Sequence, residues 1–381
     1  MTWPSYSPTC RAAVDTLLRA GGSLSAYRAN PLFPSWTGPT EGSYAWKLER
    51  EIEKRFKVKH AIAVNSGTAA LHCGLTALGK PASGKEEIIT SPYTFSATAS
   101  AIILAGYTPV FADVDPHTFC ITKETVKRVI TRRTKAILPV SLFGGMADVH
   151  GLQSFGLPVV EDACQAVGAR DSRGFSGTAG LCAAYSFNGG KNIPAGEAGA
   201  LVTNDAILAE RARLFMNHGE NFNRKEIGVN YRIQEVVACI AYHGLLELEE
   251  RNQRRIALAN KVTFECHSRG VGAHINFPSH PYEAWRDDHV YYVYPFTILP
   301  ANAERRDLFI KRMKRKGIYA SGGYLTPPLH MFKAFKQYAR GRLPVVEELS
   351  FKTLCLINDL TPDRPLSWAE YVAKSMKECL R

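Results

Sequence analysis

Apolar and polar stretches between about residues 58 and 205 repeat in the order strand, turn, helix. Buried strands are predicted by short apolar runs at residues 60–64, 87–90, 109–113, 136–141, 158–162, 182–187 and 199–203. Helices are predicted between some of these runs, at residues 69–78, 94–105 and 123–131. Strands that alternate with helices form a largely parallel sheet covered on both faces. We therefore expect an α/β fold with a mostly parallel seven-stranded sheet sandwiched by helices.

Helical patterns also lie on either side of this region. A helix at 8–20 begins after Ser7 and stops at Gly21, and an amphipathic helix at 233–258 leads into a second unit. That unit is predicted to be a smaller α+β domain, with a strand at 290–299 and helices at 303–316 and 367–380. We place the large domain at residues 1–250 and the small C-terminal domain at 251–381.

The composition of the chain indicates the cellular compartment in which we expect the protein. The chain has 381 residues, 45% of them hydrophobic, and no run approaches the roughly 20 apolar residues that a membrane span needs. Its first residues lack the basic start and apolar core of a signal peptide, so we expect a cytoplasmic protein. Nine cysteines show no metal-ligand spacing, which predicts free, mostly buried thiols and no metal site.

The formal net charge of +12 is compatible with nucleic acid or with anionic small molecules. A basic cluster at residues 311–316 is interpreted as the solvated face and end of a helix. We favour anionic small molecules, because the chemistry-bearing residues described next require one.

Three features fall at or beside predicted strand ends, where ligands gather in parallel sheets. They are the turn Ser66-Gly67-Thr68, the aspartate Asp162 and the stretch from Ser186 to Lys191. A lysine that forms an imine, an acid that keeps a ring nitrogen protonated and small residues at a helix N-terminus that hold a phosphate are what pyridoxal 5'-phosphate requires.

Asp162 follows Glu161 at the end of its strand. Successive strand side chains point to opposite faces, so only one of these two carboxylates can face the ligand. We assign that role to Asp162. Cys164, two residues later, is interpreted as a packing residue and not as a nucleophile.

Six motifs occur in a fixed order: Asn65-Ser66-Gly67-Thr68-Ala69-Ala70-Leu71, Tyr93-Thr94-Phe95, Glu161-Asp162-Ala163-Cys164-Gln165-Ala166, Ser186-Phe187 with Lys191, Gly196-Glu197-Ala198-Gly199, and Gly228-Val229-Asn230-Tyr231-Arg232. With them, the chain from about Trp36 to its end resembles the DegT/DnrJ/EryC1/StrS family of sugar aminotransferases, which are fold-type I pyridoxal phosphate enzymes. Dehydrating relatives replace the lysine with histidine, so Lys191 argues against that class.

The resemblance implies a role for each matching residue. Lys191 resembles the lysine that bonds the cofactor, and Asp162 the partner of the ring nitrogen. The remaining cofactor contacts implied are Gly67, Thr68 and Ser186 at the phosphate, Phe95 stacked on the ring, Gln165 at the 3-hydroxyl, and Asn230 given to the phosphate by a neighbouring subunit. A homodimer with shared active sites follows from the last of these.

Substrate contacts are expected from two segments. Tyr324 and His330 match the family's C-terminal segment near the sugar, and the aromatic and basic stretch that contains Arg28 and Trp36 is a second candidate. The sequence departs from the family pattern at Cys164, where alanine is usual, and at residues 188–190 before the lysine. These departures leave the cofactor chemistry in place and leave the acceptor open.

We therefore expect an aminotransferase that moves an amino group from an amino acid, L-glutamate in the first instance, to a nucleotide-linked keto-deoxy sugar. Two alternatives stay open. One is an aminotransferase that acts on a carbocyclic or other non-nucleotide ketone, and the other is a regulator that binds pyridoxal phosphate without turnover.

Overall fold

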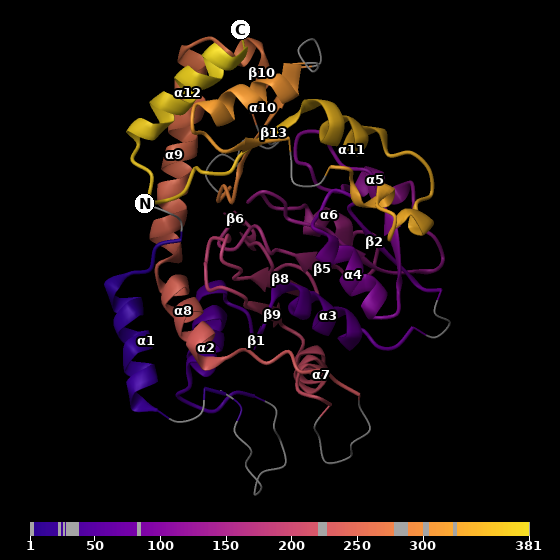
Figure 1. The fold of residues 1–381 in the computed structure, drawn as a ribbon. Helices are drawn as coiled ribbons and strands as arrows, with labels where there is room; N and C mark the ends of the chain where they lie inside the picture. Colours follow the sequence, from indigo (N-terminus) through magenta and orange to yellow (C-terminus); the bar gives the residue numbers. More distant parts are fainter. Residues whose placement is uncertain are drawn as a thin grey trace, which may run out of the picture.

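The computed structural model describes residues 4–21, 24–25, 27, 38–81, 85–219, 227–277, 289–299, 305–322 and 326–380. Its centre is a sheet of seven strands (Figure 1). Four of these form one ladder, in the order β1 (His60–Val64), β9 (Gly199–Thr203), β8 (Cys182–Ser186) and β5 (Val160–Asp162). Three more form a second ladder, in the order β3 (Thr108–Phe111), β2 (Glu87–Thr90) and β4 (Thr134–Leu138).

Two parallel bridges, Ile137 to Val159 and Val140 to Asp162, join the ladders into one sheet. Only β9 runs antiparallel to its neighbours, and the other pairings are parallel. Every residue of β2, β8 and β9 is buried, which requires cover on both faces of the sheet. The mostly parallel seven-stranded sheet predicted from the sequence is confirmed.

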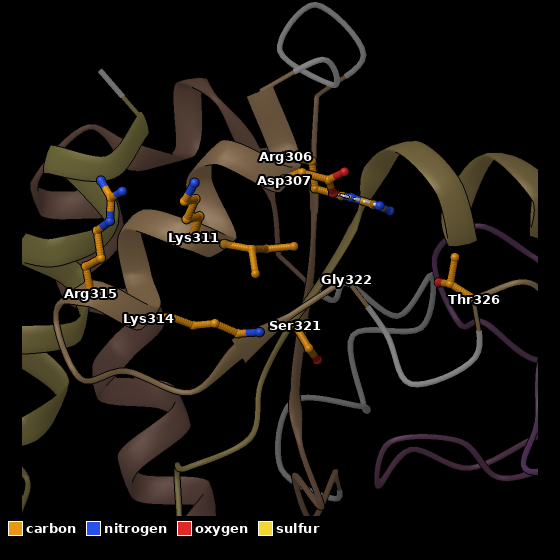
Figure 2. A pocket seen from close by; sticks show the side chains of 9 residues that line it. Arg306, Asp307, Lys311, Lys314, Arg315, Ser321, Gly322 and Thr326 are labelled. Carbon is orange, nitrogen blue, oxygen red and sulfur yellow. Dashed lines mark hydrogen bonds and ion pairs between the residues drawn. The ribbon is translucent and has the colours of Figure 1, made fainter.

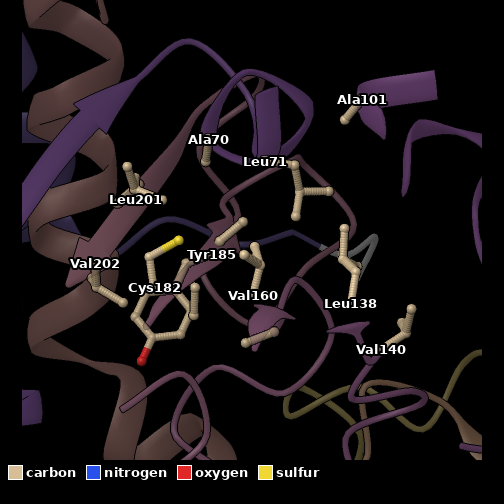
Figure 3. Packing of buried hydrophobic residues seen from close by; sticks show 14 of the residues in the cluster. Ala70, Leu71, Ala101, Leu138, Val140, Val160, Cys182, Tyr185, Leu201 and Val202 are labelled. Carbon is tan, nitrogen blue, oxygen red and sulfur yellow. The ribbon is translucent and has the colours of Figure 1, made fainter. Parts of the chain in front are cut away.

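The helices that cover this sheet come from the connections between strands and from the N-terminal region. They are α1 (Pro8–Ala20), α2 (Tyr44–Phe56), α3 (Gly67–Ala77), α4 (Ser96–Leu104), α5 (Lys123–Lys127), α6 (Val149–Gln153), α7 (Ala206–Met216) and α8 (Glu235–Leu246). Figure 3 shows apolar side chains of α3, β4, β5, β8 and β9 converging in the core. A two-stranded ribbon, β6 (Arg170–Asp171) and β7 (Gly174–Phe175), projects from the loop after β5.

A smaller antiparallel sheet lies above the first in Figure 1, in the order β10 (Ile275–Asn276), β11 (Tyr294–Ile298), β13 (Leu354–Ile357) and β12 (Ala320–Ser321). It packs with helices α9 (Leu248–Ser268), α10 (Arg306–Arg315) and α12 (Ser367–Leu380) around a separate apolar cluster. Leu248 belongs to the first core and Leu258 to the second, so we keep a boundary near residue 250 as a proposal.

The C-terminal part of the chain returns to the large sheet before it ends. Helix α11 (Pro344–Glu348) is held at its start by Asp113, whose carboxylate accepts the N–H groups of Val345 and Val346 at 3.0 Å. Strand β13 alternates between the two cores, with Leu354 and Leu356 in the large one and with Cys355 and Ile357 in the small one. The two parts therefore share one strand.

Some predicted bounds differ from the structure. The helix expected at 233–258 is interrupted at Glu247, between α8 and α9, and continues to Ser268. The strand expected to reach residue 141 ends at Leu138, because Pro139 has no N–H to continue the ladder. All nine cysteines are free, as expected, and eight are buried. Within the described ranges, no helix combines the length and the apolar character needed to cross a membrane.

Candidate active site

A cavity of 330 Å³ opens where β1, β5 and β8 end and α3 and α4 begin. Both Lys191 and Asp162 line it. So do all the other predicted cofactor contacts except Asn230, namely Gly67, Thr68, Phe95, Gln165 and Ser186. The structure thus brings together residues that the sequence spreads from position 67 to position 191.

A larger pocket of 680 Å³ lies elsewhere, between α10 and β12 (Figure 2). Its charged lining is mostly basic and includes part of the cluster at residues 311–316. Figure 2 shows Lys314 reaching toward Ser321, whereas Lys311 and Arg315 point away from it. This open surface holds neither Lys191 nor Asp162, so we place the chemistry in the smaller cavity.

Lys191 sits in the tight connection between β8 and β9. The connection closes through Phe187 N–H to the Ala198 carbonyl and Gly189 N–H to the Gly196 carbonyl, both at 2.8 Å. The Lys191 N–H donates to the Asn188 carbonyl at 2.8 Å, which fixes the backbone at the lysine itself. Its side chain is half-buried, and Nζ lies 4.2 Å from the centre of the Tyr292 ring.

Asp162 ends β5 with its side chain only 5% exposed. Its Oδ2 accepts a hydrogen bond from the Thr98 hydroxyl at 2.7 Å, and its Oδ1 accepts one from the Cys164 N–H at 3.2 Å. The Thr98 hydroxyl in turn lies 2.8 Å from the hydroxyl of Thr94. Two donors on two oxygens leave the carboxylate little freedom to rotate.

Glu161 points to the other side of the strand, as predicted. Its carboxylate accepts from the hydroxyls of Ser141 and Ser176, both at 2.6 Å, and from the Gly177 N–H at 2.8 Å. Burial raises the pKa of Glu161 in spite of these donors. It does not line the 330 Å³ cavity, so Asp162 is the strand-end carboxylate that does.

The predicted phosphate cradle is the first turn of α3. Ser66 caps this helix by accepting the Ala69 N–H at 3.0 Å, and the first N–H groups of a helix have no partner within it. Gly67 is required by close packing, because a Cβ there would lie 2.8 Å from Cys164 Sγ and 2.9 Å from Ser186 Cβ. The turn is thereby held against the end of β8.

Phe95 and Gln165 complete the cavity wall. Phe95 precedes α4 and is 60% exposed although it is apolar, so its ring is accessible from the cavity. Gln165 is 4% exposed, and its Oε1 accepts the Phe143 N–H at 3.0 Å. Burial is the main cause that raises the pKa of the Cys164 thiol far above its usual value, which keeps it neutral and supports its interpretation as packing.

Other predicted contacts lie elsewhere. Asn230 is exposed and bridges to Asn217, away from the cavity lining of its own chain, so its role at a neighbouring subunit stays a prediction. His330 is buried, with Nε2 3.4 Å from Glu347 Oε1, and it does not line the cavity. Arg28, Trp36 and Tyr324 lie outside the described residues, and their substrate roles stay predictions too.

Sequence reasoning missed two neighbours of the central pair, Thr98 and Tyr292. The spacing of Thr94 and Thr98 by four positions after a strand end was an available signal, since such residues share one helix face. Tyr292 offers no comparable signal in the sequence. It lies just before β11 of the smaller sheet, and only the packing of that segment brings it to Lys191.

The residues present fit pyridoxal phosphate. An accessible ring face suits a flat heterocycle, the held carboxylate suits a pyridine nitrogen, and a helix N-terminus suits a phosphate. Lys191 lies in the same cavity and carries the kind of amine that an aldehyde can bond. The fold and this cavity together define a fold-type I pyridoxal phosphate enzyme.

The chain belongs to the DegT/DnrJ/EryC1/StrS aminotransferase family, whose model matches residues 33–375. A relative named pleiotropic regulatory protein, from Geobacillus stearothermophilus, is 34% identical and covers 89% of this chain and 90% of its own. A UDP-N-acetyl-3-dehydro-alpha-D-glucosamine 3-aminotransferase from Acidithiobacillus ferrooxidans is also 34% identical and covers 83% of each chain. The solved structure of S. venezuelae DesV in complex with a ketimine intermediate has 31% identity and a TM-score of 0.83, covering 98% of this chain and 94% of its own. The protein is a pyridoxal phosphate-dependent aminotransferase.

Proposed function

We propose that the protein transfers an amino group from an amino acid, L-glutamate, to the keto group of a nucleotide-linked keto-deoxy sugar. The observation that carries the aminotransferase chemistry is the shared cavity of Lys191 and Asp162. The sugar is supported by the relative named for a 3-dehydro sugar nucleotide, which matches four fifths of the chain. The net charge of +12 favours the anionic donor and acceptor that this reaction needs.

When bound, the cofactor supplies an aldehyde and an electron-accepting ring. Asp162 would hold the ring nitrogen through a carboxylate that Thr98 and the Cys164 N–H keep in one orientation. The first turn of α3 would bind the phosphate, and Phe95 would support one face of the ring. Lys191 would bond the cofactor at rest, and its amine would be the group able to move a proton once it is released.

The proposed assembly is a homodimer in which each subunit completes the other's site. Asn230 is the residue expected to cross, and its exposure on this chain is compatible with that role.

A second candidate function is regulation without turnover, which is supported by the name of the Geobacillus relative. The two candidate functions differ in whether the bound cofactor exchanges an amino group with substrates. We expect purified protein to show the visible absorption of lysine-bound pyridoxal phosphate, to lose it on addition of L-glutamate, and to lack it in Lys191→Ala.

Recovery of the band on addition of a nucleotide-linked keto sugar supports the proposed acceptor. Recovery only with a carbocyclic ketone would replace the sugar with the alternative acceptor. A band that no amino acid removes would leave the regulator as the better description.

A further inference from the structure

We propose that the ring of Tyr292 is the surface against which the ammonium form of Lys191 rests when this lysine is not bonded to the cofactor. The inference rests on the aminotransferase chemistry of the same cavity and adds a residue to it. Its basis is the distance of 4.2 Å between Lys191 Nζ and the ring centroid, in a cavity that both residues line. An ammonium group at that distance from an aromatic face is attracted by it, and a neutral amine much less so.

The Tyr292 ring is held in place by its backbone. The N–H of Val290 donates to the Gly144 carbonyl at 2.9 Å, and the N–H of Val293 donates to the Phe143 carbonyl at 3.3 Å. Gly144 has a φ of 112°, and a Cβ at this position would lie 2.6 Å from Tyr291 N and 2.8 Å from Tyr292 N. The loop after β4 and the segment that bears Tyr292 therefore touch backbone to backbone.

Two side chains add to this anchorage. The guanidinium of Arg255, a buried residue, donates to the carbonyls of Tyr291 and Tyr292 at 3.4 and 3.5 Å. Asn192, next to the lysine, donates to the Val290 carbonyl at 3.4 Å and to Asn252 Oδ1 at 2.7 Å. The segments that bear Lys191 and Tyr292 are thus bonded to each other, which sets the distance between amine and ring.

The reaction creates the charge that this ring favours. If an amino donor displaced the lysine, the donor nitrogen would bond to the cofactor carbon and the bond from that carbon to the Lys191 nitrogen would break. The two N–H protons of the donor would pass to the lysine, which would leave as a neutral amine. That amine would take the proton from the donor's α-carbon and would be an ammonium group until it gave the proton to the cofactor carbon. Tyr292 stabilises this released and protonated lysine.

Comparing the binding of two cofactor forms isolates the attraction between the Lys191 ammonium and the Tyr292 ring. Pyridoxal phosphate bonds to Lys191 with loss of water and so removes the ammonium from the ring, whereas pyridoxamine phosphate has no aldehyde and leaves Lys191 free. In Tyr292→Leu we expect pyridoxal phosphate to bind more tightly relative to pyridoxamine phosphate, by roughly three- to thirty-fold. Tyr292→Phe keeps the aromatic face and should keep the wild-type ratio of the two dissociation constants.

The same comparison in Lys191→Ala supplies the control, because without the amine the Tyr292→Leu change should leave the ratio unaltered. Titrations followed by absorbance and by protein fluorescence give both constants without turnover. If Tyr292→Leu does not fold, Tyr292→Met is measured in its place.

An unchanged ratio in the lysine-bearing protein would overturn the proposal, and so would an equal change in the Lys191→Ala background, which would indicate a change of cavity shape. These outcomes are distinct from failure of the aminotransferase assignment, in which the wild type would form no lysine-bound cofactor at all.

Discussion

The Thr98 hydroxyl donates a hydrogen bond of 2.7 Å to Asp162 Oδ2, inside a region where both side chains are at least 95% buried. Because the single hydroxyl proton of Thr98 is donated to Asp162, the oxygen of Thr98 accepts the proton of Thr94. This directed chain begins in the residue before Phe95. One short stretch of chain therefore places both the Phe95 ring at the cavity and the Thr98 hydroxyl that supports Asp162.

Thr98→Val should weaken cofactor binding and lower kcat, each by roughly tenfold, because a hydrogen bond to a charged group is lost at nearly constant volume. The Val side chain cannot donate, so Asp162 gains freedom to rotate. Thr98→Ser keeps the hydroxyl and is the matched control. Cofactor titration and steady-state kinetics measure the two effects, and equal behaviour of Val and Ser would show that the hydroxyl has no such role.

Gly67→Ala should abolish or strongly reduce cofactor binding. The new Cβ would lie within 3.0 Å of Cys164 Sγ and Ser186 Cβ, so the phosphate turn must move away from β8. Gly189→Ala, whose Cβ would have no heavy atom within 4 Å, is the control in the neighbouring loop. The two variants are compared by cofactor titration, and combining Gly67→Ala with Cys164→Ala should recover part of the loss.

Asn230→Ala and Lys191→Ala should each be inactive as pure proteins if sites are shared between subunits. Mixing them in equal amounts and allowing subunits to exchange should restore about a quarter of wild-type activity, because half of the dimers then hold one intact site of two. Activity of the mixture is the measurement, and its dimeric mass is checked by light scattering. Mixtures that stay inactive after proven exchange would place Asn230 outside the partner's site.

Glu87 should make unfolding dependent on pH in the acid range. Burial alone would raise its pKa, but hydrogen bonds from Arg340, Thr131 and Arg133 outweigh burial and hold the pKa below its usual 4.5. A carboxylate with a lowered pKa in the folded state stabilises the fold fully above pH 4.5, and this stabilisation is lost as the pH falls through the folded value.

Glu87→Gln should therefore lower the free energy of unfolding by about 1–3 kcal/mol at neutral pH and flatten its acid dependence. Both arginines are partly exposed, which limits the effect by solvent screening. Glu250→Gln, in an exposed pair with Arg254, is the control and should change stability by under about 0.5 kcal/mol. Denaturant unfolding at several pH values gives the comparison, and similar curves for the two variants would contradict the prediction.

The sequence was sufficient for the sheet and for most of the cavity, for a physical reason. Apolar runs mark the buried strands, and parallel strands bring their carboxyl ends to one edge, so Asp162 and Lys191 had to lie near each other. Tyr292 could not be predicted in this way, since its approach depends on backbone contact with Gly144 and on Arg255, which belong to separate elements. Thr98 was partly predictable. The helix that bears it was expected from the sequence, but the face of that helix that meets Asp162 is determined only by packing.

Strand β13 contributes alternate side chains to both apolar interiors, Leu354 and Leu356 to one and Cys355 and Ile357 to the other. A protein truncated near residue 250 would therefore lose part of the lining of its larger interior as well as the smaller unit. A rigid-body rotation of one unit relative to the other would remove either the two leucines or Cys355 and Ile357 from the interior in which they pack. We expect the two units to unfold as a single cooperative block.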